Sequence, residues 1–279
     1  MHILGVVVYF HGDIDILIEN ILSYIQNIDH LLIWMNSPIA DQGKILSIVG
    51  HNKISFGGNG ENIGIAKALN LAIQGTTGEY DFLLTMDQDS KWVNFAEYVS
   101  MVQKSEKEIY NAFAYGPKVI VSSEGQFTLE SSIVKVDQLI TSGMLVNLKH
   151  LRAIGGYCED LWIDGIDEEL CLRAQSNQLM LYRIESEFLL QQYGSGKRIA
   201  IKKHEFIIPA YNAQRKYYIA KNHIYLIKKY KLGFREKKDI IINYIIYPIA
   251  NTLLFEKDKC NKLKSITHGV IDGIKWKVK

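Results

Sequence analysis

The chain has 279 residues, of which 48% are hydrophobic and 22% charged, a composition that predicts a globular protein with a sizeable core and excludes a disordered or low-complexity chain. The net charge of +2 conceals an asymmetry, because residues 1–196 hold 12 basic against 24 acidic residues and residues 197–279 hold 20 against 6. The three widely spaced cysteines form neither a disulfide framework nor a metal-binding pair, which predicts a cytoplasmic protein.

Strand and helix patterns alternate along the first part of the chain. Continuous apolar runs predict buried strands at Ile3–Phe10, Leu31–Met35, Ile54–Phe56 and Phe82–Met86. Helical spacing of apolar residues predicts helices over Ile14–Ile28 and Ile63–Ile73. This alternation predicts an α/β fold with a mostly parallel, twisted sheet flanked by helices. Ligands bind such sheets at the carboxyl ends of the strands.

The second half mixes both patterns. Strands are predicted at Ala112–Val121 and Gln138–Asn147, the latter interrupted by Thr141-Ser142-Gly143. Helices are predicted at Leu148–Ile154 and Asp167–Gln175, and from about Tyr211 the chain reads as helical and basic.

No signal peptide and no transmembrane span are expected. Met1–Phe10 is apolar but lacks a basic start and a small-residue cleavage site. The apolar stretch Ile240–Phe255 is interrupted by Pro248 and by asparagines, and it is shorter than the roughly 20 apolar residues that a bilayer core requires.

Asp87-Gln88-Asp89 follows a predicted buried strand. Two carboxylates at i and i+2 in an extended turn can reach one divalent cation, and hard cations bind one or two carboxylates together with substrate phosphate oxygens. An ordinary acidic turn fits the residues equally well. The position of the turn, at the end of a strand in an α/β pattern, favours the metal or donor site.

Other polar clusters allow structural readings. Asp164-Gly165-Ile166-Asp167-Glu168-Glu169 fits acidic residues in the first turn of a helix, or a carboxylate base there. Asn62 fits a helix N-cap, or a helix start that faces an anionic ligand. The histidines form no metal-binding pair, and His204 is kept as a candidate ligand.

Six segments together resemble the inverting family 2 glycosyltransferases of the GT-A fold, and more specifically the bacterial rhamnosyltransferases. Asp87-Gln88-Asp89-Ser90 has the form of the Asp-x-Asp motif that is typical of the rhamnosyl branch, and it is the most specific of them. The other segments are residues 6–11, 61–70, 141–143, 162–173 and 215–222. The resemblance covers nearly the whole chain.

The resemblance implies a domain organisation and a cofactor. Residues 1–205 are expected to form the GT-A domain, with a donor-nucleotide half at 1–110 and an acceptor half at 111–205. A helical, basic C-terminal region is expected over 206–279. The implied cofactor is a divalent metal, Mg²⁺ or Mn²⁺.

The resemblance also implies residue roles. Asp89 and Asp87 are expected to hold the metal, with Asp167 as the catalytic base supported by Glu169 and Arg173. The side chains expected to bind the donor are those of Tyr9, His11, Asn36, Asn62, Lys67 and Asp87. The residues expected on the acceptor side are Ser142, Gly143 and Trp162.

Two positions depart from the family pattern. Met35 stands where the family often has an aspartate that contacts the base, and Gln191 stands where it often has a histidine. If that histidine helps at the metal or the diphosphate, this chain must bind them differently. His204 is the candidate replacement.

The implied function is transfer of L-rhamnose from dTDP-rhamnose, with inversion, to a cell-surface polysaccharide or a lipid-linked glycan. A donor of the UDP-galactose or galactofuranose type and a catalytically silent nucleotide-sugar-binding protein remain alternatives. Nucleic acid is not expected as a partner, because the basic residues fall in a segment that matches the transferases.

The basic C-terminal third allows peripheral contact with an anionic membrane at the inner face of the cytoplasmic membrane. Ile240–Phe255 would then be an interfacial helix. The competing interpretation is a core helix packed on the transferase domain, with the charges facing water. Both stay open on the sequence alone.

Overall fold

A computed structural model describes residues 1–50, 52–76, 80–120, 132–191, 197–201, 204–208 and 211–277. The chain divides into two compact units. Unit 1 comprises Met1–Asp160 and Ile166–Gln192, and unit 2 comprises Leu161–Gly165 and Tyr193–Lys279. Apart from the short segment Leu161–Gly165, the division between the units falls near residue 192.

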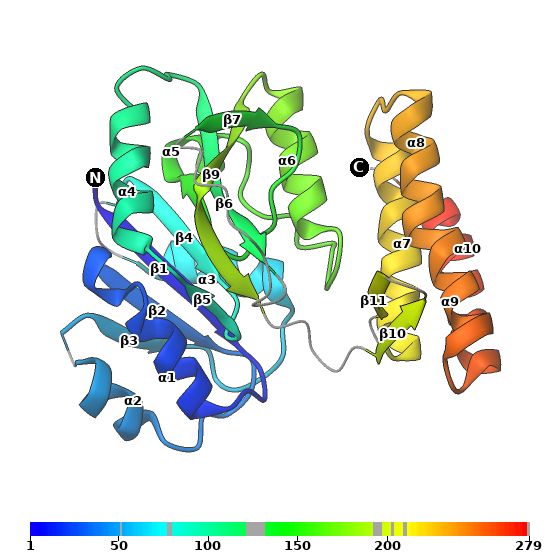
Figure 1. The fold of residues 1–279 in the computed structure, drawn as a ribbon, viewed down its shortest axis with the longest axis horizontal. Coiled ribbons are helices and arrows are strands. Elements are labelled where there is room, and N and C mark those ends of the chain that lie inside the picture. The colour runs from blue at the N-terminus through cyan, green and yellow to red at the C-terminus, as the bar shows by residue number, and fades with distance from the viewer. Residues whose placement is uncertain are drawn as a thin grey trace. The chain divides into compact units, whose positions relative to one another are not determined.

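Unit 1 is an α/β unit built on one curled sheet (Figure 1). Its elements are β1 (Ile3–Tyr9), α1 (Ile14–Leu22), η1 (Ile25–Asn27), β2 (His30–Met35), α2 (Gln42–Val49), β3 (Ile54–Gly57), α3 (Ile65–Gly75), β4 (Phe82–Met86), β5 (Ser90–Trp92), α4 (Phe95–Ser105), β6 (Ala112–Ile120), β7 (Ile133–Val136), β8 (Met144–Asn147), α5 (Leu148–Ala153), α6 (Ile166–Ser176) and β9 (Met180–Gln191). The strand order is β3-β2-β1-β4-β8-β6-β9-β5, with β7 paired to β9.

The first half of the sheet is parallel, as predicted. β1 pairs in parallel with β2 and β4, and β2 pairs in parallel with β3. All five residues of β4 are buried, as in a strand covered on both faces. β8 then joins β4 and β6 in antiparallel fashion, while β6 and β9 are parallel.

Both faces of the sheet are covered by helices. Ile3 and Val7 of β1 belong to a buried cluster with residues of α1 and α4, including Leu17 and Tyr98. Because side chains alternate along a strand, the intervening Leu4 and Val6 point to the opposite face. α3 contacts β1 and β2 and contributes the buried residues Ala66, Ala68, Leu69 and Ala72.

Several predicted boundaries were wrong. The helix predicted over Ile14–Ile28 ends at Leu22 and gives way to the 3₁₀ turn η1. Of the strand predicted at Gln138–Asn147, only Met144–Asn147 forms, because Gly143 adopts a positive φ of 78° and donates its N–H to the Thr85 carbonyl. Val121, predicted as a strand end, lies outside the described residues.

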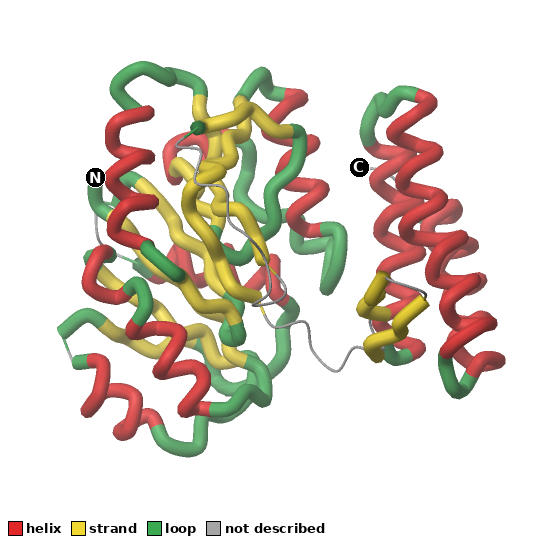
Figure 2. The backbone as a smooth tube through the Cα atoms, in the orientation of Figure 1, coloured by secondary structure: helices red, strands yellow, loops and turns green. Residues whose placement is uncertain are grey.

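Unit 2 is mainly helical, as predicted (Figure 2). Its elements are β10 (Lys197–Ile201), β11 (His204–Ile208), α7 (Ala213–Lys229), α8 (Phe234–Ile241), the π-helical segment η2 (Ile242–Ile246), α9 (Tyr247–Phe255) and α10 (Lys259–Lys275). α7 and α10 pack closely because α10 presents glycines there: a Cβ on Gly273 would lie 2.7 Å from the Lys221 carbonyl oxygen. Within the described ranges, no helix is long and apolar enough to cross a membrane.

Candidate active site

The candidate site lies at the carboxyl edge of the parallel strands. β2, β1 and β4 are neighbours, so the turns that follow them meet. The Asn36 N–H donates to the Tyr9 carbonyl (2.9 Å) and the His11 N–H donates to Ser37 Oγ (2.8 Å). The third turn joins through Gln88, whose Oε1 accepts from the Phe10 N–H at 2.8 Å. Three segments that are far apart in sequence therefore form one rim.

Asp87 is fixed on both sides. Its N–H donates to Ser142 Oγ at 3.0 Å, and its Oδ2 accepts from Gln191 Nε2 at 2.9 Å. Ser142 is almost fully buried, so the turn 141–143 is a rigid support for the start of the acidic turn. The structure thus brings together Asp87 and the predicted residues Ser142 and Gly143.

Asp89 has a different environment. It is partly buried, and burial raises the pKa of its carboxyl above the ordinary value while a backbone N–H opposes the shift. An ionised carboxylate here loses hydration, and among the described residues no ion pair with Asp89 offsets that loss. A bound cation would supply a positive charge next to the ionised carboxylate, so Asp89 is suited to the metal-binding role predicted for it.

The donor set suits a hard cation that shares its coordination with a ligand. Among the residues that the structure describes, no group of three or more His, Cys, Asp or Glu side chains is arranged to hold a metal ion. Mg²⁺ is commonly held by one or two carboxylates plus substrate phosphates and water, so a carboxylate pair suffices when a diphosphate is present. His204 lies in β11 of unit 2, whereas Asp87 and Asp89 belong to unit 1.

Gln191, which departs from the family pattern, lies beside the acidic turn. β9 pairs with β5 in antiparallel fashion, and Gln191 lies opposite Ser90 in that register. This pairing sets its amide beside Asp87. The position where the family often has histidine is therefore occupied by a neutral side chain that contacts the acidic motif.

The predicted donor-binding residues take several roles in the structure. Tyr9 is buried, and its hydroxyl donates to the Gly12 carbonyl at 2.6 Å, which shapes the turn after β1. His11 is exposed and has a φ of 46°, a strained conformation for a residue with a side chain. Lys67 is exposed in the first turn of α3.

No side chain caps the first turn of α3, but side chains of Asn36 and Asn62 bond to the residues just before the helix. The N-cap is Gly64, with a φ of 83° and no side-chain cap, so the prediction of Asn62 as N-cap was wrong. Asn62 lies two residues before Gly64, and its Oδ1 accepts from the Gly64 N–H at 3.1 Å. The buried Asn36 accepts from the Ile63 N–H and donates to the Gly64 carbonyl.

Asp167 lies in the first turn of α6 and is the candidate base. Burial and the neighbouring carboxyl of Glu168 raise the pKa of Asp167 well above its ordinary range. A carboxylate with a raised pKa is a stronger base at neutral pH than an ordinary aspartate.

Glu169 and Arg173 anchor α6. Glu169 is fully buried and forms an ion pair with Arg173 at 2.9 Å. Arg173 also donates to the carbonyls of Ile154 (2.5 Å) and Gly156 (2.7 Å). These contacts fix α6 to the loop at residues 154–156.

The segment before α6 is held inside unit 2. Arg215 donates to both carboxylate oxygens of Asp164, and Asn222 Nδ2 donates to the carbonyls of Ile163 and Asp164. Both residues belong to the C-terminal helix segment that resembles the family. Trp162, expected on the acceptor side, is exposed in this segment.

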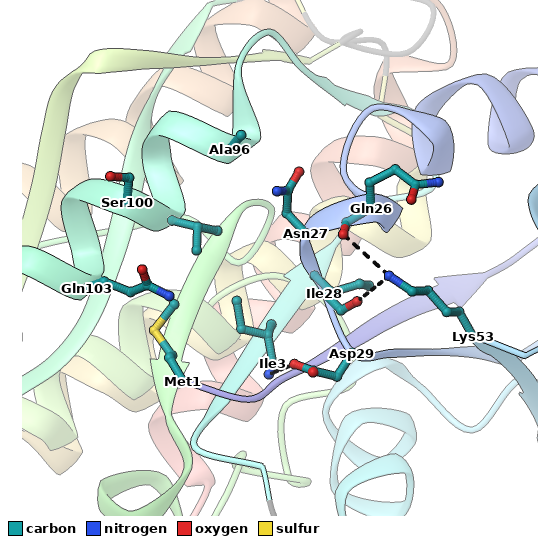
Figure 3. A pocket seen from close by; sticks show the side chains of 11 residues that line it. Met1, Ile3, Gln26, Asn27, Ile28, Asp29, Lys53, Ala96, Ser100 and Gln103 are labelled. Atoms are coloured by element: carbon teal, nitrogen blue, oxygen red, sulfur yellow. Dashed lines mark hydrogen bonds between the residues drawn. The ribbon is translucent and has the colours of Figure 1, made fainter.

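A separate hollow of about 400 Å³ lies at the amino ends of the strands (Figure 3). Its two charged side chains bond within the protein: the Lys53 ammonium donates to the carbonyls of Ile25, Gln26 and Ile28, and Asp29 accepts from the Ile3 N–H. It lies at the opposite edge of the sheet from the acidic turn, so it takes no part in the candidate site.

The comparisons with known proteins agree with this geometry. No established family model matches the chain. A dTDP-rhamnosyl transferase, RfbF of Shigella flexneri, is 25% identical over 243 residues, which cover 77% of each protein. Residues of the acidic rim and of α6 therefore belong to a chain that is similar to a sugar transferase along most of its length.

Solved structures share the fold. A mannosyltransferase of Pyrobaculum calidifontis in complex with GDP-Man and Mn²⁺ has a TM-score of 0.59, at 12% identity, over 100% of this chain and 76% of its own. Staphylococcus aureus TarS 1–349 has a TM-score of 0.57, at 11% identity, over 97% of this chain and 81% of its own. GalNAc-T7 with UDP, GalNAc and Mn²⁺ has a TM-score of 0.64, at 11% identity, over 96% of this chain, which spans 54% of that protein.

These neighbours confirm the predicted fold class, and the curated relative confirms the predicted resemblance. The chain is a GT-A-fold protein that resembles the bacterial rhamnosyltransferases, and the comparisons support glycosyltransferase function.

Proposed function

We propose that the chain transfers L-rhamnose from dTDP-rhamnose, with inversion, to a cell-surface polysaccharide or a lipid-linked glycan. The observation that carries the proposal is the acidic turn Asp87–Asp89 at the carboxyl edge of the sheet, braced by Ser142 and Gln191. The relative named a dTDP-rhamnosyl transferase supports the donor.

Asp87 and Asp89 would hold a divalent metal, Mg²⁺ or Mn²⁺, against the donor diphosphate. When bound, the metal would neutralise charge that develops on the departing diphosphate. Two neighbours of the same fold were crystallised with Mn²⁺. The bonds from Ser142 and Gln191 keep Asp87 in place, so little reorganisation accompanies donor binding.

The rim of turns would bind the rest of the donor. Tyr9 and Asn36 act by shaping the turns, since their polar groups bond within the protein. The exposed side chains of His11, Asn62 and Lys67 are available to contact the nucleotide. Lys67 would add positive charge close to the diphosphate.

Asp167 would remove the proton from the acceptor hydroxyl. The acceptor oxygen then forms a bond to the anomeric carbon as the bond from that carbon to the dTDP oxygen breaks on the opposite face. One displacement inverts the configuration and requires no sugar–enzyme intermediate. Glu169 and Arg173 hold α6 in position. Of the residues expected on the acceptor side, the buried Ser142 and Gly143 would act by supporting the acidic turn, and the exposed Trp162 would be available to contact the acceptor.

A donor screen tests the proposal. The protein is incubated with dTDP-rhamnose, UDP-galactose and a galactofuranose donor, with Mg²⁺, with Mn²⁺ and with a chelator. Metal-dependent release of dTDP from dTDP-rhamnose, exceeding release from the other donors, is the expected result. Preference for a UDP-sugar would show that dTDP-rhamnose is not the donor. Binding without turnover of any donor would favour a catalytically silent nucleotide-sugar-binding protein. The anomeric configuration of a transfer product, read by NMR, tests inversion.

A further inference from the structure

The helical stretch of α8, η2 and α9, which follows α7, exposes its apolar side chains. No residue of α8 or η2 is buried, and the buried residues of α9 are the polar Asn251 and Thr252. Large apolar side chains are exposed instead, with Phe234 84%, Ile246 54% and Leu254 68% accessible. This arrangement is the reverse of a helix that packs its apolar side on the core of its own unit.

The exposed residues line up because of η2. Phe234 and Ile241 are seven residues apart, as are Ile246 and Leu253, and seven residues are about two turns of α-helix. Ile241 and Ile246 are five residues apart across the π-helical segment, whose i to i+5 hydrogen bonds make a wider turn than an α-helix and keep the two residues on about the same side. Phe234, Ile241, Ile246 and Leu253 therefore form one stripe, the apolar face.

The inner side of the same helix is fixed by polar contacts. Glu256, directly after α9, forms ion pairs with Lys216 of α7 (2.8 Å) and Lys262 of α10 (2.6 Å). The buried hydroxyl of Thr252 is satisfied within α9, where it donates to the Pro248 carbonyl at 2.7 Å. Unit 2 thus holds the helix by its polar side and leaves the apolar face uncovered within the unit.

Basic residues gather where the apolar face begins. Residues 228–238 hold the basic residues Lys228, Lys229, Lys231, Arg235, Lys237 and Lys238 against one acidic residue, Glu236. Glu236 is engaged at the helix start, where it accepts from the Gly233 N–H. An exposed phenylalanine among lysines and arginines, continued by an apolar stripe, complements a surface that is anionic outside and apolar below.

We propose that the apolar face docks unit 2 onto an anionic lipid bilayer, with α8, η2 and α9 lying in the plane of the interface. This rests on the proposed function only in its purpose, which is to bring the enzyme to a lipid-linked acceptor. The docking itself requires neither donor nor metal.

Vesicle flotation of the full-length protein tests the docking. The protein is mixed with phosphatidylcholine vesicles, with and without phosphatidylglycerol, at low and at high salt and without nucleotide. We expect binding to the anionic vesicles at low salt and its loss with neutral lipid or high salt. Phe234→Ser/Ile246→Ser/Leu253→Ser should lower the partition coefficient at least about tenfold. The matched control, Ile48→Ser/Val93→Ser/Tyr110→Ser, removes exposed apolar groups of unit 1 and should bind as the wild type does.

A charge series separates the two attractions. Arg235→Gln/Lys237→Gln/Lys238→Gln should weaken binding to anionic vesicles, and Lys104→Gln/Lys107→Gln/Lys149→Gln in unit 1 should not. Equal partition of the wild type and the apolar-face variant would overturn the proposal. So would a wild-type dimer in sedimentation velocity that the apolar-face variant dissociates, because a second copy would then cover this face. Vesicle binding without turnover refutes only the proposed function, and turnover without vesicle binding refutes only the docking.

Discussion

Asp87 and Asp89 are two residues apart but differ in environment. Asp87 accepts a hydrogen bond from Gln191, whereas burial raises the pKa of Asp89. Asp89 in its ionised form is therefore the residue that gains most from a cation.

Asp89→Asn should abolish Mg²⁺-dependent binding of dTDP, and Asp87→Asn should weaken it, as measured by titration calorimetry. Because its raised pKa favours the protonated form, Asp89 stabilises the metal-free fold below its ordinary pKa, and this contribution is lost as the pH rises through the raised value. Asp89→Asn should therefore raise the melting temperature of the metal-free protein at neutral pH. The exposed Asp160→Asn is the control, and metal-dependent affinity retained by Asp89→Asn would contradict the assignment.

Gln191 places a neutral amide in hydrogen-bond contact with the Asp87 carboxylate. Gln191→Glu would place a second carboxylate beside Asp87, and two neighbouring carboxylates repel each other when no cation is present. The metal-free variant should melt below the wild type, and Mg²⁺ should raise its melting temperature by more than it raises that of the wild type. Gln191→Ala, which adds no charge, is the control in the same thermal scan. Equal responses of the three proteins to Mg²⁺ would exclude Gln191 from the neighbourhood of the ion.

Asp167→Asn keeps the size of the side chain and removes its basicity. We expect turnover to fall by roughly 10²-fold or more, the usual scale for loss of a general base, with donor affinity near that of the wild type. Since the base must be ionised and burial raises its pKa, the rate of the wild type should fall on the acid side at a pH above the ordinary aspartate range. Turnover retained by Asp167→Asn but lost in Glu168→Gln would show that Glu168, and not Asp167, is the base.

At the scale of elements, α6 depends on one buried ion pair. Arg173 joins the fully buried Glu169 to the carbonyls of Ile154 and Gly156. Arg173→Met removes the arginine that pairs with the buried Glu169 carboxylate, and breaking such a buried pair costs about 3–5 kcal/mol. Urea denaturation should show this loss, and the double variant Glu169→Gln/Arg173→Met should recover part of it. A double variant no more stable than Arg173→Met would show that lost packing of the arginine, and not the loss of the ion pair, causes the destabilisation.

The sequence predicts those elements whose signal is local. β1 and β4 are runs of mostly apolar residues, so burial in a parallel sheet was predictable from their residues. β9 was not predicted, because it carries Arg183, Glu185 and Glu187 among its apolar residues. Its strand conformation depends on pairing with β6, β5 and β7, which come from distant parts of the chain.

In the candidate site, too, local patterns identify some residues, while the contacts between distant segments could not be predicted. Asp87 and Asp89 stand out as carboxylates after a buried strand, but the contact from Gln191 depends on the β5–β9 register, which no local pattern encodes. Likewise, Arg215 and Asn222 belong to a segment that resembles the family, yet their contact with residues 163–164 arises only in the folded unit.

At the scale of the whole molecule, the chain separates its tasks between two units. The acidic turn, the rim of turns after β1 and β2, α6 and Gln191 all belong to unit 1. The basic excess and the apolar face belong to unit 2. A nucleotide ligand is therefore expected to stabilise one unit directly.

Hydrogen exchange with and without dTDP and Mg²⁺ tests this division. A ligand at about 100 times its dissociation constant stabilises the protein that binds it by about 2.7 kcal/mol, and this slows exchange of amides that open together with the site by up to about 100-fold. Amides of β1, β4 and α3 should slow in this way, because they adjoin the proposed donor site. Amides of α7 and α10 should keep their rates, because their protection comes from the close helix contact at Gly269 and Gly273 within unit 2. The Asp89→Asn variant with the same ligands is the control and should show no slowing. Equal slowing across α10 in the wild type would mean that the two units open as one, and the separation of tasks would then not extend to their stability.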